Sequence, residues 1–232
     1  MKAVGIIPSR YASSRFPGKP LIDLKGKSMI QRVYENASKA TLLDEVIVAT
    51  DDQRIYDHVL GFGGKVQMTS QHHTSGTDRC GEVAKQIEAD IIINIQGDEP
   101  FIEPAQLEEV AAGFSSGAPI LTLIKKITDP ETLFNVNTPK VVCNVDGNAL
   151  YFSRQTIPFL RGVEPSEWLN QHTFFKHIGL YAYRADILPG LSALKPTSLE
   201  LAESLEQLRW IQNGIQIKAI ETQFETIGID SP

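Results

Sequence analysis

Strand-length apolar runs alternate with segments of helical period, and this alternation constrains the fold more than any other feature of the chain. In the first hundred residues, apolar runs at 3–8, 45–50 and 90–96 are separated by segments whose apolar residues recur every three to four positions. Because these runs are apolar at successive positions, both faces of the sheet must be covered. The pattern predicts an α/β fold with a mostly parallel sheet between helices.

The segments between these runs carry helix-boundary signals. Ser28 is expected to cap a helix, and Asp51 is expected to open a second helix that ends near residues 61–64. The apolar face of the first helix is expected to consist of Met29, Ile30, Val33 and Tyr34. A short strand at 65–68 and a helix at 78–89 complete the expected elements of this half.

The second half of the chain does not continue this strand–helix alternation, and its sequence favours β-hairpins. Asp146-Gly147-Asn148 is a turn sequence between two strand-like runs, and residues 155–173 form a long irregular excursion. The expected elements are strands at 120–127, 140–145, 149–153, 175–184 and 215–220, and a helix at 198–213 whose inward stripe is Leu201, Leu205 and Leu208. We expect one domain over residues 1–232, with the hairpin region as an insertion beside the sheet.

The charge distribution narrows the class of ligand. The chain carries a net charge of −6, which argues against a nucleic-acid partner. Residues 1–27 hold six cations against one acid, a local charge of +5, so the rest of the chain carries −11. A basic segment on an acidic protein suits a small polyanion. The chain opens directly on an apolar strand and has no apolar run of bilayer length, so we expect a cytosolic protein with no membrane partner.

A basic loop at residues 8–20 follows the first strand directly. In open α/β sheets, ligands bind beyond the carboxyl ends of the strands. Arg10, Arg15 and Lys19 could neutralise a triphosphate there, the arginines as forks and the lysine as a point charge. The known phosphate motifs are absent, because Leu21 stands where a Walker A loop needs glycine. The alternative is a solvated surface turn.

A carboxylate follows the strand at 90–96. The sequence Gly97-Asp98-Glu99-Pro100 ends this strand, so Asp98 should project at the carboxyl edge of the sheet beside the basic loop. Mg²⁺ favours one or two carboxylates together with phosphates and waters. The alternative is that Asp98 caps the helix starting near Pro104, and spacing alone leaves both interpretations open.

Several separate motifs, in collinear order over nearly the whole chain, carry a family resemblance. The sequence resembles the CMP-KDO synthetases (3-deoxy-manno-octulosonate cytidylyltransferases). The matching segments are Ile6-Ile7-Pro8-Ser9-Arg10, Gly18-Lys19-Pro20-Leu21, Val48-Ala49-Thr50-Asp51, Thr74-Ser75-Gly76-Thr77-Asp78-Arg79, Asn94-Ile95-Gln96-Gly97-Asp98-Glu99-Pro100, Tyr151-Phe152-Ser153-Arg154, His177-Ile178-Gly179-Leu180-Tyr181 and Leu205-Glu206-Gln207-Leu208-Arg209.

The resemblance implies a three-layer nucleotide-diphospho-sugar transferase-like fold with a small hairpin-rich dimerisation insertion. It implies an enzyme of lipopolysaccharide biosynthesis, a homodimer, that joins KDO to the CMP part of CTP and releases pyrophosphate with Mg²⁺. Competing interpretations are a cytidylyltransferase for another acidic sugar (a sialic acid or 8-amino-KDO), a glycosyltransferase and a non-catalytic nucleotide-binding regulator. A glycosyltransferase is disfavoured, since Gly97-Asp98-Glu99 supplies no D-x-D-like pair.

The resemblance also assigns roles to residues. Lys19, Asp98 and Arg10 would be catalytic, and the metal would be held by Asp98 and Asp230. The implied nucleotide contacts are Pro8, Ser9, Arg10, Arg15, Lys19, Ser75, Arg79 and Gln96. The implied sugar contacts are Arg154, His177, Tyr181, Glu206 and Gln207.

Several of these residues could instead have a purely structural role. Thr77 or Asp78 could simply cap the helix that follows them. His177 and Tyr181 lie an even number apart on a strand and so share one face, which could be an amphipathic core face. His72 and His73 have no acidic or thiol partner at ligand spacing, so we expect surface residues rather than a metal site. The family continues into a further helix after the motif around Asp230, whereas this sequence stops at Pro232.

Overall fold

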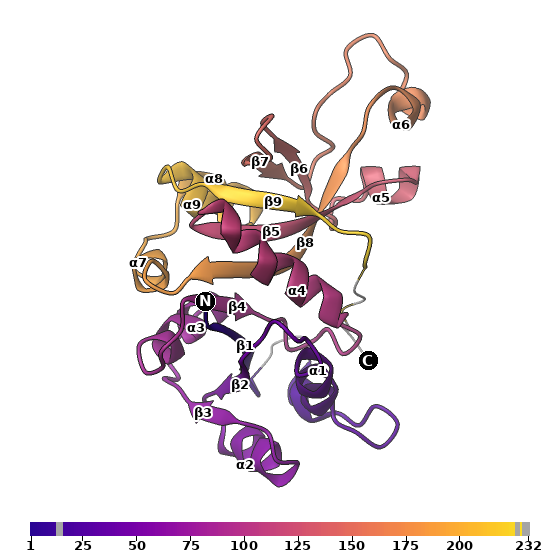
Figure 1. Cartoon of the computed structure of the whole chain (residues 1–232). Helices are drawn as coiled ribbons and strands as arrows, with labels where there is room; N and C mark the ends of the chain where they lie inside the picture. The colour runs from indigo at the N-terminus through magenta and orange to yellow at the C-terminus, as the bar shows by residue number, and fades with distance from the viewer. Residues whose placement is uncertain (13–15, 226–227, 229–232) are drawn as a thin grey trace.

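The computed structural model describes residues 1–12, 16–225 and 228, and its centre is one twisted sheet (Figure 1). The strands are β1 (Ala3–Ser9), β2 (Glu45–Thr50), β3 (Val66–Met68), β4 (Ile91–Asn94), β5 (Ile120–Lys126), β6 (Lys140–Cys143), β7 (Ala149–Ser153), β8 (Phe175–Arg184) and β9 (Ile217–Glu221). Their order is β3-β2-β1-β4-β8-β5-β9. Only β8 on this path runs antiparallel to its neighbours, so the prediction of a mostly parallel sheet is confirmed.

Helices cover both faces of the sheet. They are α1 (Met29–Ala37), α2 (Gln53–Gly61), α3 (Gly76–Ala84), α4 (Pro104–Gly113), α5 (Pro130–Phe134), α6 (Trp168–Gln171), α7 (Leu188–Ser192), α8 (Ser198–Glu203) and α9 (Gln207–Gln212), with short 3₁₀ turns η1 (Lys19–Leu21), η2 (Phe114–Ser116) and η3 (Pro165–Glu167). The core on one face includes α1, α2 and α4, and the core on the other includes α3, α7 and α9. No helix in the described residues is long and apolar enough to cross a bilayer.

Successive side chains along the central strands point to opposite faces of the sheet and pack in different cores. In β1, Val4 and Ile6 belong to the core under α3, whereas Ile7 belongs to the core under α1. In β4, Ile92 and Ile93 divide in the same way. All five side chains are completely buried. Strands with two buried faces read as continuous apolar runs, which explains the sequence pattern.

Two helix starts differ by a residue or more from their predicted positions. Ser28 caps α1 as predicted, with its side chain accepting a hydrogen bond from the backbone of Gln31. At α2, however, the cap is Asp52 rather than Asp51. At α3 the N-cap is Ser75 rather than Thr77 or Asp78, although the Asp78 side chain completes the capping box from the N3 position. The expected helix at 78–89 therefore begins at Gly76 and ends at Ala84.

The predicted helix at 198–213 is broken into α8 and α9. Ser204 adopts a left-handed conformation (φ 53°), which a continuous helix does not allow. As a result Leu201 is 69% exposed, so its placement in an inward stripe is wrong, whereas Leu205 and Leu208 are buried as predicted. We call residues 203–207, where the chain turns, the α8–α9 corner.

The hairpin-rich segment lies off the main strand path and joins it where β6 pairs with β8 (Figure 1). Strands β6 and β7 form the predicted hairpin, and Gly147 at its turn has φ of 74°. Beside it, residues 155–173 are not wholly irregular, since they include η3 and α6. Trp168 and Phe174 pack there in a small separate core with Leu133.

Candidate active site

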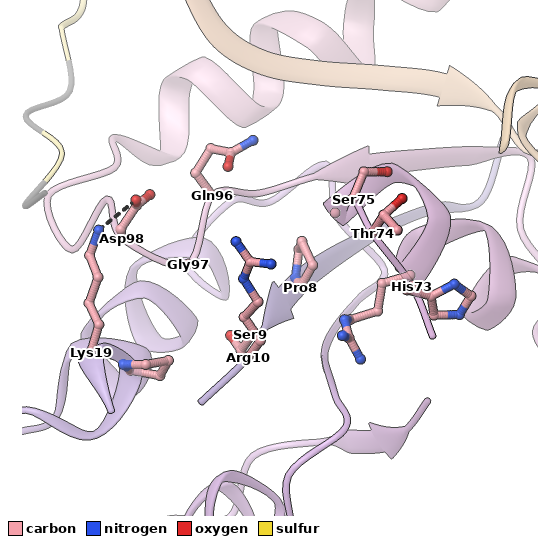
Figure 2. Close-up of a pocket in the computed structure, with 13 residues that line it drawn as sticks. Pro8, Ser9, Arg10, Lys19, His73, Thr74, Ser75, Gln96, Gly97 and Asp98 are labelled. Atoms are coloured by element: carbon pink, nitrogen blue, oxygen red, sulfur yellow. Dashed lines mark hydrogen bonds and ion pairs between the residues drawn. The ribbon is translucent and has the colours of Figure 1, made fainter. Parts of the chain in front are cut away.

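The carboxyl ends of β1 and β4 meet at one edge of the sheet, and a cavity of about 250 Å³ opens there. One side of the cavity comes from the end of β1 and the loop after it, and another from the exit of β4. The third comes from the loop that enters α3. The lining residues are Pro8, Ser9, Arg10, Lys19, Pro20, His73, Thr74, Ser75, Gly76, Arg79, Gln96, Gly97 and Asp98. The structure thus brings together all the predicted nucleotide residues that it describes. Figure 2 shows most of them around the cavity.

Two glycines allow the backbone to close around this cavity. Gly18 has φ of 74°, its amide donates to the Tyr11 carbonyl oxygen at 2.9 Å, and a Cβ there would meet the Tyr11 ring at 3.2 Å. Gly97 lies so close to β1 that a Cβ would come within 3.1 Å of the Pro8 carbonyl oxygen. A side chain at either position would therefore displace the loop that carries Lys19 or the one that carries Asp98.

Lys19 and Asp98 form an ion pair across one end of the cavity. Lys19 Nζ lies 2.8 Å from Asp98 Oδ2, and the two side chains are 13% and 36% exposed (Figure 2). Asp98 is not a helix cap, because Glu103 occupies the N-cap position of α4. Arg10 lies between this pair and the α3 end of the cavity in Figure 2, and its side chain is exposed. Cationic and acidic groups thus face one space that is open to solvent.

The wall on the α3 side is fixed by a capping box. Ser75 Oγ accepts a hydrogen bond from the Asp78 backbone N–H at 3.1 Å, and an Asp78 carboxylate oxygen accepts from the Ser75 backbone N–H at 3.2 Å. The first turn of a helix also leaves backbone N–H groups without helical partners. Across the cavity, Gln96 Nε2 donates to the Gly179 carbonyl oxygen at 3.2 Å and so ties the exit of β4 to β8.

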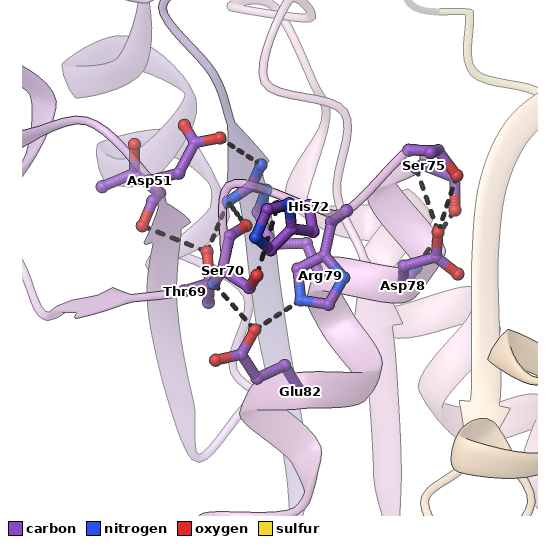
Figure 3. Close-up of polar contacts among 11 residues, drawn as sticks. Asp51, Thr69, Ser70, His72, Ser75, Asp78, Arg79 and Glu82 are labelled. Carbon is purple, nitrogen blue, oxygen red and sulfur yellow. Dashed lines mark hydrogen bonds and ion pairs between the residues drawn. The ribbon is translucent and has the colours of Figure 1, made fainter.

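Arg79 holds the end of the sheet together (Figure 3). Its guanidinium is 4% exposed and lies 2.8 Å from the Asp51 carboxylate, and it also donates to Thr69 Oγ1. These contacts join α3 to the loops that follow β2 and β3. Much of the donor capacity of Arg79 is therefore used within the protein, and its contact with a nucleobase stays a prediction.

His73 is a cavity residue that the sequence interpretation missed. Its Nε2 contacts the Glu82 carboxylate. The same carboxylate accepts from the Ser70 backbone N–H at 2.9 Å, and Figure 3 shows Ser70 and Glu82 together. That backbone bond, followed by the imidazole, holds the pKa of Glu82 below its usual range. The expectation of a surface position is wrong for His73, which is half-buried in the cavity wall and has its acidic partner nine residues away on α3. His72 is exposed, as expected.

The predicted sugar residues are not among the residues that line this cavity. His177 and Tyr181 share one face of β8, as predicted, with ring centroids 5.2 Å apart. Glu206 in the α8–α9 corner accepts a hydrogen bond from Thr77 Oγ1 at 2.9 Å, so it adjoins the α3 wall. Gln207 is 5% exposed. Arg154 lies on the far side of the corner, where its Nε donates to the carbonyl oxygen of residue 203 at 2.7 Å.

Burial shapes the protonation of two of these groups. It lowers the pKa of His177 to about 3, so the imidazole is neutral and its Nε2 lies 3.0 Å from Thr122 Oγ1. Burial also raises the pKa of Glu206, opposed by the hydrogen bond from Thr77. Two predicted residues, Arg15 and Asp230, lie outside the described residues.

Comparison with known proteins gives consistent matches over the whole chain. A family model described as cytidylyltransferase matches residues 4–220. The 3-deoxy-manno-octulosonate cytidylyltransferase of Phocaeicola vulgatus is 59% identical, with 100% of this chain and 94% of the relative covered. The enzyme of the same name from Cytophaga hutchinsonii is 57% identical, with 99% and 93% covered. A solved structure of CMP:2-keto-3-deoxy-manno-octonic acid synthetase complexed with CTP is 47% identical, with a TM-score of 0.92 and 100% and 94% covered.

Proposed function

The chain belongs to the cytidylyltransferase family, among the 3-deoxy-manno-octulosonate cytidylyltransferases, and we infer that it transfers the CMP group of CTP to 3-deoxy-manno-octulosonate (KDO) with release of pyrophosphate. One observation in the structure carries the inference. Lys19 of the basic loop and Asp98 after β4, which lie 79 residues apart in the chain, face one cavity at the carboxyl edge of the sheet.

Transfer of a nucleotidyl group depends mostly on positioning and charge neutralisation. Lys19 would hold the negative charge that develops on the α-phosphate, and Arg10 would hold the oxygens of the departing pyrophosphate. The backbone N–H groups at the start of α3 would orient the nucleotide from the opposite wall. These roles require no covalent intermediate on the protein.

The residues of the cavity fit a magnesium ion. Asp98 offers a carboxylate at the cavity, the kind of ligand that Mg²⁺ takes together with phosphates and waters. The Ser9 hydroxyl, also in the cavity, is buried and has no hydrogen-bond partner within the described part of the chain. A Cβ added to Gly228 would lie 4.0 Å from the Asp98 carbonyl oxygen, so Gly228 lies beside Asp98. In the sequence, Gly228 precedes Asp230 by two residues. When bound, Mg²⁺ stabilises phosphate charge and lowers the pKa of a coordinated hydroxyl.

We propose that KDO binds between the α3 wall and the α8–α9 corner. Glu206 and Gln207 would accept and donate hydrogen bonds to the sugar hydroxyls, and His177 and Tyr181 would offer neutral polar groups from β8. Support comes from the unpaired Gln207 Nε2, which is buried without a partner among the described residues. Such a group is costly to bury unless something hydrogen-bonds to it.

We further propose a homodimer that works in the cytoplasm in lipopolysaccharide biosynthesis, as the family implies. Exposed apolar side chains on the hairpin support the dimer: Val145 is fully exposed and Leu150 is 56% exposed. Light scattering of the purified protein would test the oligomeric state, and a monomer at micromolar concentration would contradict it.

The activity is tested by incubating the protein with CTP, Mg²⁺ and KDO while following pyrophosphate release and the nucleotide-sugar product. We expect CMP-KDO, and little product when UTP or ATP replaces CTP. Sialic acid and 8-amino-KDO serve as alternative acceptors. Faster turnover of either than of KDO would overturn the proposed substrate, and no turnover with any acceptor would overturn the proposed activity.

A further inference from the structure

A fully buried lysine lies at the base of the β6–β7 hairpin. The Lys140 side chain is 0% exposed, and its Nζ donates to the carbonyl oxygens of Asn135 at 2.8 Å and Arg154 at 2.7 Å. Lysine is almost never fully buried unless it is paired. Here both observed acceptors are neutral, and burial lowers the pKa of the ammonium. Burial of the Lys140 ammonium is therefore unfavourable for the stability of the fold, and a functional role would explain it.

A second cation, Arg154, lies beside it and also contacts neutral acceptors. Its Nε donates to the Glu203 carbonyl oxygen at 2.7 Å, and its terminal nitrogens donate to the carbonyl oxygens of Val136 and Ser204, each at 3.3 Å. An arginine carries five N–H groups, so one remains on each terminal nitrogen. Guanidinium N–H groups are well suited to donate hydrogen bonds to a carboxylate.

One carboxylate belongs to this group. Glu203 accepts from the Arg154 backbone N–H at 2.9 Å and from Ser153 Oγ at 2.7 Å, and these bonds lower its pKa against the effect of burial. Lys140, Arg154 and Glu203 thus hold two positive charges against one negative charge, a surplus of +1. We call these three residues the hairpin junction. Lys176, the β8 partner of Lys140 in register, lies outside this group and pairs with Glu225, which Lys125 also contacts.

The hairpin junction adjoins the predicted sugar residues. The residue before Lys140 accepts a hydrogen bond from the His177 backbone N–H at 2.9 Å, and the Phe152 ring lies 5.1 Å from the His177 ring. Glu203 begins the α8–α9 corner, which continues into Glu206. A positive surplus of partly desolvated charge beside a sugar site favours an anionic sugar over a neutral one.

We propose that Lys140 is a positioning and specificity-determining residue for the acidic group of the sugar. Its ammonium fixes the segment that carries Arg154 and supplies the surplus charge that selects a carboxylate. The inference rests on the proposed function, since it presumes an acidic sugar substrate. Lys140 acts through Arg154 and through its field, without touching the substrate.

The test uses two KDO analogues that lack the anomeric hydroxyl and cannot react, one with the sugar carboxylate and one with a carboxamide in its place. Their inhibition constants against KDO are measured for the wild-type protein and for Lys140→Met, which removes the charge and leaves an unbranched side chain one atom shorter. We expect the preference for the carboxylate to fall on the order of tenfold, the effect of one unit charge about 12 Å away through an effective dielectric near 20. The KM for CTP should not change.

Glu203→Gln provides the opposite change, because it raises the surplus charge. It should increase the preference for the carboxylate, which no general loss of structure would produce, and it decides the question if Lys140→Met does not fold. The control is Lys65→Met, which replaces an exposed lysine that pairs with Glu45. A carboxylate preference equal to wild type in Lys140→Met, or equal weakening of both analogues, would overturn the inference. Lack of CMP-KDO formation by the wild-type protein would instead overturn the proposed function.

Discussion

Replacing Lys19 by methionine should slow the reaction far more than it destabilises the protein. The Lys19–Asp98 pair is partly exposed, at 13% and 36%, and ion pairs of this kind contribute about 0–1 kcal/mol to the free energy of unfolding. Loss of one preorganised donor to a developing oxyanion costs about 2.7–4 kcal/mol of barrier, or about 10²–10³ in kcat. The kinetic effect should therefore exceed the effect on stability severalfold.

Two measurements separate these effects. Steady-state pyrophosphate release at saturating CTP, Mg²⁺ and KDO gives kcat, and urea denaturation gives the free energy of unfolding. Lys65→Met is a matched control, since Lys65 also forms an ion pair at 2.8 Å, with Glu45, away from the cavity. Its kcat should equal that of the wild type. The assigned role of Lys19 fails if Lys19→Met keeps the wild-type kcat, or if its loss of activity follows only from a comparable loss of folded protein.

Other variants test other parts of the structure. Ser28→Ala and Ser75→Ala each remove a helix N-cap and should lower the unfolding free energy by about 1 kcal/mol, but only Ser75→Ala should raise the KM for CTP, because only Ser75 lines the cavity. Equal KM values for both would contradict that placement. His177 is neutral in the folded protein, with a pKa of about 3, and becomes charged on unfolding below about pH 6.5, so stability should fall on acidification from 6.5 toward 3. His177→Asn should reduce this loss in denaturation curves at about pH 5.5 and about pH 7.5, one unit either side of the ordinary pKa, and an unchanged pH dependence would be inconsistent with a neutral imidazole in the folded protein. Phe152→Ala should lower the unfolding free energy by about 3–5 kcal/mol, since Phe152 is completely buried, and a loss below about 1 kcal/mol would show that the hairpin is not packed as described.

The elements that sequence alone predicted well are those governed by local pattern. Strands β2 and β8 begin and end where predicted, because the apolar period and the turn residues around them are unambiguous. Ser28 was identified as a cap because a short hydroxyl side chain before an apolar face is a local signal. The cavity edge was also predictable, since the carboxyl ends of parallel strands gather potential ligands.

What sequence could not predict depends on contacts between distant residues. The break at Ser204 has no glycine or proline to mark it, and it is held from outside by Arg154, 50 residues away. The bond between Thr77 and Glu206 spans 129 residues and joins the nucleotide wall to the α8–α9 corner. The partner of His73 is nine residues distant, a spacing that follows no helical or metal-ligand rule.

The central claim is that the triphosphate of CTP lies between Lys19 and Asp98 at the carboxyl edge of the sheet. A crystal structure of this protein with CTP and Mg²⁺ tests it most directly. Lys19 Nζ should have exchanged its contact with Asp98 for a phosphate oxygen, with the cytidine along the α3 wall. A triphosphate bound elsewhere, with the Lys19–Asp98 pair intact at 2.8 Å, would contradict the claim.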